Sequence, residues 1–123
     1  MSDVTMYGIP NCDQVKKAKN WLGEHQIDVH FHDFKKAGVT PELIQTWLKQ
    51  VGWEVLINRK GTTWRNLPQQ EQAEIDDERS AIQCMVQHPS VIKRPVLVVH
   101  HKHSTEILVG FSEAAYTQLD FAN

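Results

Sequence analysis

The first third of the chain, residues 4–34, alternates strand, helix and strand patterns, and this order restricts the fold more than any other feature. Val4-Thr5-Met6-Tyr7 is short and rich in β-branched and aromatic residues, which predicts a strand. Apolar residues at helical spacing then predict a helix from about Asp13 to Gln26. Residues 27–34 nearly alternate apolar and polar side chains, which predicts a second strand. Strand, helix and strand this close together form a βαβ unit with parallel strands.

Cys12 lies where the first strand gives way to the helix. Gly8 and Pro10 break the strand and turn the chain just before it. At a helix start, unpaired N–H groups and the positive end of the helix dipole favour a negative group. A thiol there ionises more easily, and the thiolate is the nucleophilic form. Position alone favours a reactive thiol; the alternative is a small residue that merely fits a tight turn.

The next segment, residues 35–52, reads as a polar break followed by a helix. Lys35-Lys36-Ala37-Gly38 interrupts the apolar pattern. Thr40 and Pro41 are typical of an N-cap and a first helical position. Apolar residues continue the helical spacing beyond them, and Gly52 is the expected stop.

The sequence pattern predicts secondary structure least clearly over residues 53–90. Trp53-Glu54-Val55-Leu56-Ile57 is too short to separate strand from helix. Asn58–Arg65 is predicted as a loop with three cations and a glycine, either simply solvated or a binding loop. Gln69–Asp77 is polar and acidic, as on a helix surface or a connector, whereas Asp77–Gln87 predicts a helix closed by Pro89.

The last third predicts two strands and a helix. Val96–Val99 is continuously apolar, like a strand covered on both faces. Pro95 stands at its start, where a sheet tolerates proline, and the Arg-Pro bond there can be cis. Thr105–Val109 resumes a strand and completes a hairpin. Ser112 caps a final helix from Glu113 to Leu119.

The second cysteine and the histidines are interpreted as structural or solvated. Cys84 lies near the apolar edge of a predicted helix and is expected to pack, with a role as resolving partner of Cys12 as the alternative. His30 and His32 share a strand face, and His100–His103 occupies a hairpin tip. A metal site would need further ligands in reach, so we predict none.

Length and composition indicate a single globular domain over residues 1–123. The chain is 41% hydrophobic and 23% charged, which argues against disorder. A net charge of -2 gives no basic footprint for nucleic acid. The N-terminus lacks a signal-peptide pattern and no long apolar run is present, so we expect no membrane association and a cytoplasmic location with reduced thiols.

The order βαβ, helices, ββα, with a cysteine after the first strand and a proline opening the third, resembles the thioredoxin-like fold. It implies an α/β architecture: a mixed four-stranded sheet whose core spans about 3–34 and 91–119, with a helical insertion over about 35–90. More specifically, Tyr7–Cys12, Asn58-Arg59-Lys60 and Met85–Val96 are similar to the arsenate reductase (ArsC) family. That family includes arsenate reductases, the Spx transcription regulators and the smaller YffB group. The phrase Cys12-Asp13-Gln14-Val15-Lys16-Lys17-Ala18 is most similar to the YffB group.

The resemblance implies a role for each candidate site residue. Cys12 is the nucleophile, Arg59 and Arg94 help to bind an oxyanion beside it, and Pro95 is cis with its backbone next to the thiol. A guanidinium suits an oxyanion or a carboxylate and favours thiolate over thiol. Asn11, from the cysteine motif, and Lys60 and Lys93, next to the arginines, complete the candidate set.

Three departures from the family pattern bear on function. Arsenate reductases carry a third arginine in the hairpin region, whereas no arginine follows Arg94 here. Spx regulators usually carry CxxC, whereas Val15 occupies the second position here. Asp13 follows the cysteine and opposes thiolate formation unless it points to solvent.

The resemblance therefore implies a thiol-dependent reductase with no bound cofactor and with glutathione as co-substrate. Because no second cysteine lies near Cys12, an external thiol has to release the adduct, with glutaredoxin as a further candidate partner. The substrate is a small oxyanion or a disulfide, and arsenate is one specific version. The alternative is an Spx-like regulator or adaptor that binds a protein such as RNA polymerase.

Overall fold

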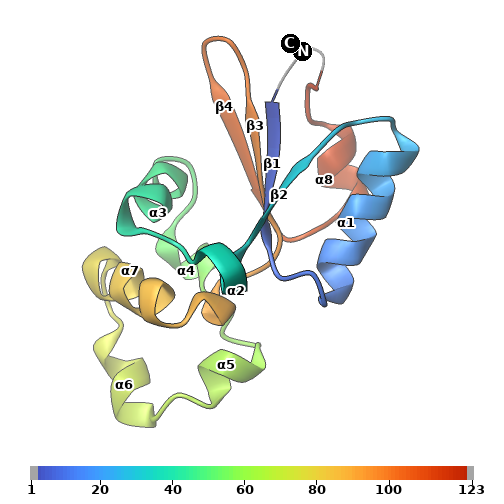
Figure 1. Ribbon diagram of the computed structural model, residues 1–123. Helices are drawn as coiled ribbons and strands as arrows, with labels where there is room; N and C mark the ends of the chain where they lie inside the picture. Colours follow the sequence, from blue (N-terminus) through green and yellow to red (C-terminus); the bar gives the residue numbers. More distant parts are fainter. Residues whose placement is uncertain (1–2, 122–123) are drawn as a thin grey trace. The chain divides into compact units, whose positions relative to one another are not determined.

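The computed structural model describes residues 3–121 and divides the chain into two compact units (Figure 1). The sheet unit combines the described parts of Met1–Asp33 and Arg94–Asn123, and the helical unit is Phe34–Lys93. Residues 1–2 and 122–123 of the predicted domain lie outside the described residues. That the two units form a single domain stays a prediction. Within residues 3–121, no helix has the length and apolarity needed to cross a membrane.

The sheet unit contains the predicted mixed four-stranded sheet, in the order β2-β1-β3-β4. The strands are β1 (Asp3–Gly8), β2 (His30–Asp33), β3 (Val96–His100) and β4 (Thr105–Val109). β1 pairs parallel with β2 and antiparallel with β3, and β4 pairs antiparallel with β3. The predicted βαβ unit and C-terminal hairpin are therefore confirmed.

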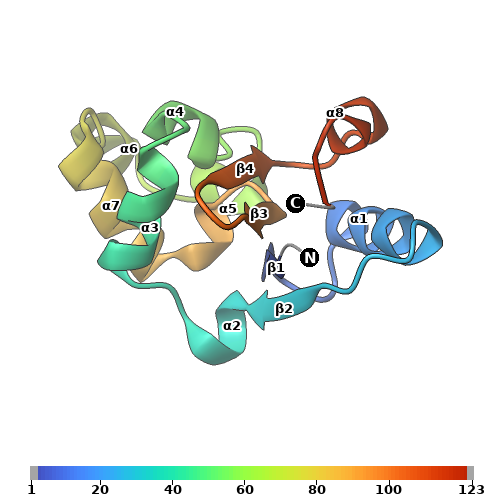
Figure 2. The ribbon, with the colours of Figure 1, turned by 90° about the horizontal axis from the view of Figure 1, so that it is seen from above.

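Two helices pack together on one face of this sheet, as Figure 2 shows from above. They are α1 (Asp13–Glu24) and α8 (Glu113–Thr117). Trp21 of α1 meets Tyr116 of α8 edge to face, with ring centroids 5.5 Å apart. Between the helices and the sheet lies the core of the unit, which comprises Val4, Met6, Val15, Ala18, Trp21, Leu22, Leu97, Val99 and Tyr116.

The second strand is shorter than the alternating pattern predicts. Its first predicted residue, Ile27, is hydrogen-bonded to the end of α1 and does not belong to β2. Gln26 has a left-handed backbone with φ of 60°, and Ile27 N donates to Leu22 O at 2.9 Å. This closure satisfies a carbonyl of the last helical turn and ties Ile27 to the helix. At the other end, Phe34 is buried and begins a helix.

The helical unit consists of short helices, most of them under nine residues. They are α2 (Phe34–Ala37), α3 (Pro41–Leu48), α4 (Trp53–Leu56), α5 (Thr62–Arg65), α6 (Gln69–Glu74), α7 (Glu78–Gln87) and the 3₁₀ turn η1 (Pro89–Val91). The predicted start of α3 is confirmed, since Leu43 N donates to Thr40 Oγ1 at 3.2 Å. The predicted helix α7 is also confirmed, with Asp77 as its N-cap.

Several boundaries in this unit differ from the prediction. The expected polar break is largely the helix α2. Gly52 is the N-cap residue of α4 and does not end α3. Trp53–Ile57 resolves into α4 followed by Ile57, which bridges to Ile92. Half of the predicted loop Asn58–Arg65 is the helix α5, whose Trp64 is buried. Helices of four residues depend on such tertiary burial, which short sequence patterns do not reveal.

Candidate functional site

Cys12 is the N-cap residue of α1. Its backbone is extended, with φ of -135° and ψ of 128°, and its carbonyl accepts the first helical hydrogen bond, from Lys16 N at 2.9 Å. The side chain is partly buried. By geometry its thiol, a weak acceptor, makes no full cap hydrogen bond, although Gln14 N–H and Val15 N–H lie close enough to lower its pKa. The predicted position at the junction of strand and helix is thus confirmed.

The surroundings of Cys12 favour its thiolate form. Burial raises the pKa of the thiol, but hydrogen bonds from Val15 N–H, the Arg94 side chain and Gln14 N–H lower it, and so does the charge of Arg94. The lowering contributions outweigh burial, so the pKa of Cys12 lies below its ordinary value. A thiolate accepts these hydrogen bonds far better than a thiol does.

Arg94 and Pro95 lie with Cys12 in the sheet unit. The Arg94–Pro95 peptide bond is cis, as the resemblance implies. Pro95 is buried at the start of β3, and its carbonyl accepts from Gly110 N at 2.8 Å. A Cβ atom at Gly8 would lie 2.9 Å from Val15 Cγ2 and 3.9 Å from Arg94 Cβ. Glycine at the end of β1 therefore allows α1 and the Arg94 segment to approach closely.

Two neighbours of Cys12 are exposed. Asn11 Oδ1 accepts a weak hydrogen bond from Lys16 Nζ at 3.4 Å. The Asp13 carboxylate is exposed and is not among the groups that shift the pKa of Cys12. The opposition expected from Asp13 is therefore not found, because its side chain reaches water.

The other three candidates, Arg59, Lys60 and Lys93, belong to the helical unit. Arg59 and Lys60 are exposed residues of the loop between α4 and α5. Lys93 is also exposed, and its backbone N–H donates to Leu56 O at 2.7 Å. Cys12, Asn11, Arg94 and Pro95 thus share one unit, while these three cations are described within the other.

Sequence reasoning missed two tryptophans beside the Arg59 loop. The Arg59 guanidinium carbon lies 5.7 Å from the ring centroid of Trp53 and 5.7 Å from that of Trp64. The available signal was an arginine flanked on both sides by aromatic residues, a combination that favours cation–π contact.

Cys84 has the opposite character to Cys12. It is 5% exposed within α7, and burial and then the Glu71 carboxylate raise its pKa. Its predicted packing role is confirmed. His101, at the hairpin tip, pairs with Glu106 at 2.7 Å. No cluster of three or more metal-binding side chains occurs among residues 3–121.

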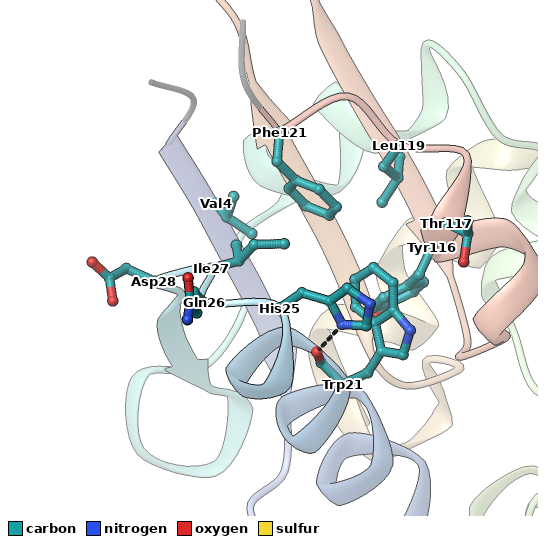
Figure 3. A pocket seen from close by; sticks show the side chains of 10 residues that line it. All are labelled: Val4, Trp21, His25, Gln26, Ile27, Asp28, Tyr116, Thr117, Leu119 and Phe121. Atoms are coloured by element: carbon teal, nitrogen blue, oxygen red, sulfur yellow. Dashed lines mark hydrogen bonds between the residues drawn. The ribbon is translucent and has the colours of Figure 1, made fainter.

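A separate cavity of about 440 Å³ opens at the far end of α1 (Figure 3). His25 stacks on Trp21 at 3.8 Å, and its Nδ1 lies 2.7 Å from Trp21 O. Tyr116, Leu119 and Phe121 face the cavity from the C-terminal segment. Trp21, a lining residue, lies nine residues after Cys12 along α1, which at 1.5 Å per residue is a rise of about 14 Å, so the cavity is distinct from the cysteine site.

Comparison with known proteins identifies the family. The ArsC family model matches residues 7–119. The chain belongs to the ArsC family. An uncharacterized protein of Haemophilus influenzae is 39% identical over 113 residues, which cover 92% of this chain and 95% of the relative.

Two solved structures of the family are similar over nearly the whole chain. A YFFB protein is 43% identical, with a TM-score of 0.83 over 93% of this chain and 96% of the other. An arsenate reductase (ArsC) related protein from Brucella melitensis is 45% identical, with a TM-score of 0.70 over 95% and 96% of the two chains. These matches confirm the thioredoxin-like ArsC fold and the likeness to the YffB group.

The Spx regulators are more distant members of the same family. A global transcriptional regulator Spx from Lactiplantibacillus plantarum is 28% identical over 114 residues, covering 89% of this chain and 80% of the regulator. The chain is therefore more similar to the YffB protein than to this regulator.

Proposed function

We propose that this ArsC-family chain is a glutathione-coupled thiol reductase that uses Cys12 as a single nucleophile. The observation that carries the proposal is the lowered pKa of Cys12 at the start of α1, with the Arg94 side chain hydrogen-bonded to it. Thiolate is the reactive species, and a helix start beside an arginine is a setting in which proteins use it. Cys12 and Cys84 are both free cysteines, and the proposal places the protein in the cytoplasm, where thiols stay reduced.

The proposed reaction is two successive thiol–disulfide exchanges. The Cys12 thiolate attacks the glutathione sulfur of a mixed disulfide between glutathione and the substrate. That sulfur–sulfur bond breaks, the substrate leaves as a thiolate that takes a proton from water, and Cys12 becomes bonded to glutathione. A second glutathione thiolate then attacks this adduct, which regenerates the Cys12 thiolate and releases glutathione disulfide. In the net exchange, the substrate sulfur goes from a disulfide to a thiol and the sulfur of the second glutathione goes from a thiol to a disulfide, so the electrons balance.

Other residues of the proposed site bind the substrate. Arg94 stabilises the Cys12 thiolate, and the family resemblance assigns Arg59 to an anionic group of the same ligand, such as a glutathione carboxylate. Asn11 and Pro95 line the thiol side of the site, and Lys60 and Lys93 add positive charge. Glutaredoxin is a further proposed partner, able to resolve the adduct in place of free glutathione.

Arsenate reduction is a narrower version of this proposal. Arsenate is a dianion with tetrahedral oxygens, and one or two arginines cradle it less completely than three do. No arginine follows Arg94 in the chain. We therefore expect faster turnover with glutathione mixed disulfides than with arsenate.

Comparison of wild type with Cys12→Ser tests the proposal directly. Each protein is incubated with glutathione disulfide, and the glutathione adduct is located by peptide mass spectrometry. We expect an adduct on the Cys12 peptide of the wild type and none on the same peptide of the variant. Mixed-disulfide turnover that persists at the wild-type rate in Cys12→Ser would contradict the proposal.

The second candidate function is a regulator or adaptor that binds a protein partner such as RNA polymerase. The observation in its favour is the relationship to Spx regulators. The lowered pKa of Cys12 favours the reductase, since an adaptor needs no activated thiol. A pull-down with purified RNA polymerase, compared between wild type and Cys12→Ser, separates the two functions.

A further inference from the structure

The Arg59 backbone is held in a turn with both ends fixed. Gly61 N donates to Asn58 O at 3.1 Å, and Lys60 N donates to Asn58 Oδ1 at 3.2 Å. Asn58 N donates in turn to Val91 O at 2.9 Å. A Cβ atom at Gly61 would lie 2.9 Å from Asn58 Nδ2 and 3.3 Å from Asn58 O, so glycine there leaves room for the Asn58 side chain. Arg59 is the second residue of this turn, and its side chain therefore leaves from a defined point.

Two indole rings then hold the side chain. The guanidinium carbon lies 5.7 Å from the centroids of both Trp53 and Trp64, within the range of a cation–π contact. Trp64 is 9% exposed, and its own backbone carbonyl accepts a hydrogen bond from Gln72 Nε2 at 2.8 Å. Trp53 is half-buried at the start of α4. Both rings are thus anchored by secondary structure on either side of the turn.

The contacts with the rings leave the hydrogen-bond donors of Arg59 available. Within residues 34–93, all of which the structure describes, no acidic side chain forms an ion pair with Arg59, which is exposed. A cation–π contact uses the face of the guanidinium, whereas its N–H donors point outward in the plane of the group. That planar fork matches the two oxygens of a carboxylate.

We propose that Trp53 and Trp64 are positioning residues that hold the Arg59 guanidinium ready to receive a carboxylate of a thiol substrate. This inference rests on the proposed function, in which Arg59 binds a carboxylate of a peptide-like thiol, and adds two positioning residues to it. A free arginine side chain has many rotamers, and ordering it on binding costs affinity. The two indole rings order the Arg59 side chain before the ligand binds. A ligand carboxylate then has only to replace water at the guanidinium, and little side-chain entropy is lost on binding.

The test compares two disulfides that differ in carboxylates. Glutathione disulfide carries carboxylates, whereas bis(2-hydroxyethyl) disulfide is neutral. The rate of mixed-disulfide formation at Cys12 is measured with each reagent, and their ratio reports carboxylate recognition. Because both rates come from the same protein sample, a change in folded fraction cancels in the ratio. Peptide mapping keeps Cys84 out of the measurement.

We expect Trp53→Leu and Trp64→Leu each to lower this ratio by about two- to fivefold, which corresponds to a cation–π contact of about 0.5–1 kcal/mol at an exposed site. Trp53→Phe and Trp64→Phe keep an aromatic face and should retain most of the ratio. Arg59→Gln should lower it at least as far as either leucine variant. In the Arg59→Gln background, Trp53→Leu should have no further effect. Arg65→Gln removes an exposed cation of α5 and is the matched control, expected to leave the ratio unchanged.

Each alternative outcome overturns a different statement. If Arg59→Gln lowers the ratio and neither leucine variant does, the positioning role is wrong and the reductase stands. If Trp53→Leu acts equally in the Arg59→Gln background, the indole works independently of Arg59 and the inference is again wrong. If Arg59→Gln leaves the ratio unchanged, Arg59 receives no carboxylate. Mixed-disulfide turnover that persists at the wild-type rate in Cys12→Ser would overturn the reductase itself.

Discussion

The two helices that carry the cysteines, α1 and α7, use them in opposite ways. Cys12 begins α1, where neighbouring N–H groups and Arg94 lower its pKa. Cys84 lies inside α7, 5% exposed, where burial and Glu71 raise its pKa. The chemistry of each thiol thus follows from its position along a helix and not from the residue type. At a helix start, N–H donors face the side chain, whereas in the interior the same donors are used by the helix itself.

The N-cap residues of these two helices also differ, in whether their side chains cap the helix by hydrogen bonds. Asp77 caps α7 in a reciprocal box with Ser80, with Ser80 N 2.8 Å from Asp77 Oδ1. Hydrogen bonds from the Ser80 backbone and side chain lower the pKa of Asp77. Cys12 occupies the equivalent position in α1 and makes no cap hydrogen bond as a thiol. α7 therefore has an N-cap that stabilises the helix, whereas the N-cap position of α1 holds a thiol with a lowered pKa.

The largest expected effect is the difference in reactivity between the two thiols. At pH 7 we expect iodoacetamide to modify Cys12 at least about 100-fold faster than Cys84. Cys84 needs a local opening, and each 1.4 kcal/mol of opening free energy slows modification about tenfold. Since the pKa of Cys12 is lowered, its rate should level off at a lower pH than that of an ordinary cysteine. Peptide mapping over a pH series measures both; equal rates, or a Cys12 curve shifted to higher pH, would contradict the comparison.

A second test disturbs the start of α1 and leaves α7 untouched. In Gly8→Ala the new methyl group would lie 2.9 Å from the stiff Val15 side chain, which is fully buried. We expect a loss of about 1–3 kcal/mol in the free energy of unfolding, as for other overpacked cores. Slower alkylation of Cys12 should accompany it, because Val15 N–H favours the thiolate.

Gly23→Ala is the matched control for that substitution. A Cβ atom there meets nothing within 4 Å, and Gly23 lies in the same helix. Alanine in a helix is favoured over glycine by about 0.5–1 kcal/mol, so this variant should be at least as stable as wild type. Urea unfolding measures the free energy of unfolding of both variants. If Gly8→Ala and Gly23→Ala are equally stable, the close approach of Val15 to Gly8 does not limit the residue at position 8.

The sequence predicts the sheet unit well because its elements have strong local signals. The spacing of apolar residues after Cys12 predicts α1, and the continuous run Val96–Val99 predicts the central strand β3. The exception is the second strand, where the closure of α1 at Gln26 and Ile27 takes residues that alternate like a strand. The end of a helix of this kind depends on the backbone conformation of one residue, here Gln26. The spacing of apolar residues gives no information about that conformation.

The helical unit and the Arg59 loop were harder to predict. Helices such as α4 and α5 have four residues each, too few for a periodic pattern. They form because Leu56 and Trp64 are buried by residues distant in the sequence. Position and family resemblance point to Cys12, Arg59, Arg94 and Pro95. The contacts of Trp53 and Trp64 with Arg59 are visible only in the folded structure.

A smaller effect is expected when Arg94 loses its charge. Arg94→Gln removes both a hydrogen bond to the Cys12 thiolate and a nearby positive charge. The pKa of Cys12 should rise, and alkylation at pH 7 should slow by about three- to tenfold, since a hydrogen bond to a charged group contributes about 1.5–3 kcal/mol before solvent screening. Cys84 should be unaffected. Lys17→Gln, an exposed cation of the same helix, is the control, and an equal slowing in that variant would assign the effect to general charge and not to Arg94.

The smallest expected effect separates a reactive cysteine from one that only fits a turn. Serine and aspartate are among the best N-cap residues, and their caps contribute about 0.5–2 kcal/mol to helix stability. Cys12→Ser and Cys12→Asp should therefore raise the free energy of unfolding by about 0.5–1 kcal/mol while they abolish the glutathione adduct. Asp77→Ala, the converse change in α7, should lower stability and leave the adduct intact. Urea unfolding measures the stability of all three. If Cys12→Ser and Cys12→Asp are both less stable than wild type, cysteine is the residue that the turn prefers; if both are more stable, stability alone does not explain a cysteine at the start of α1.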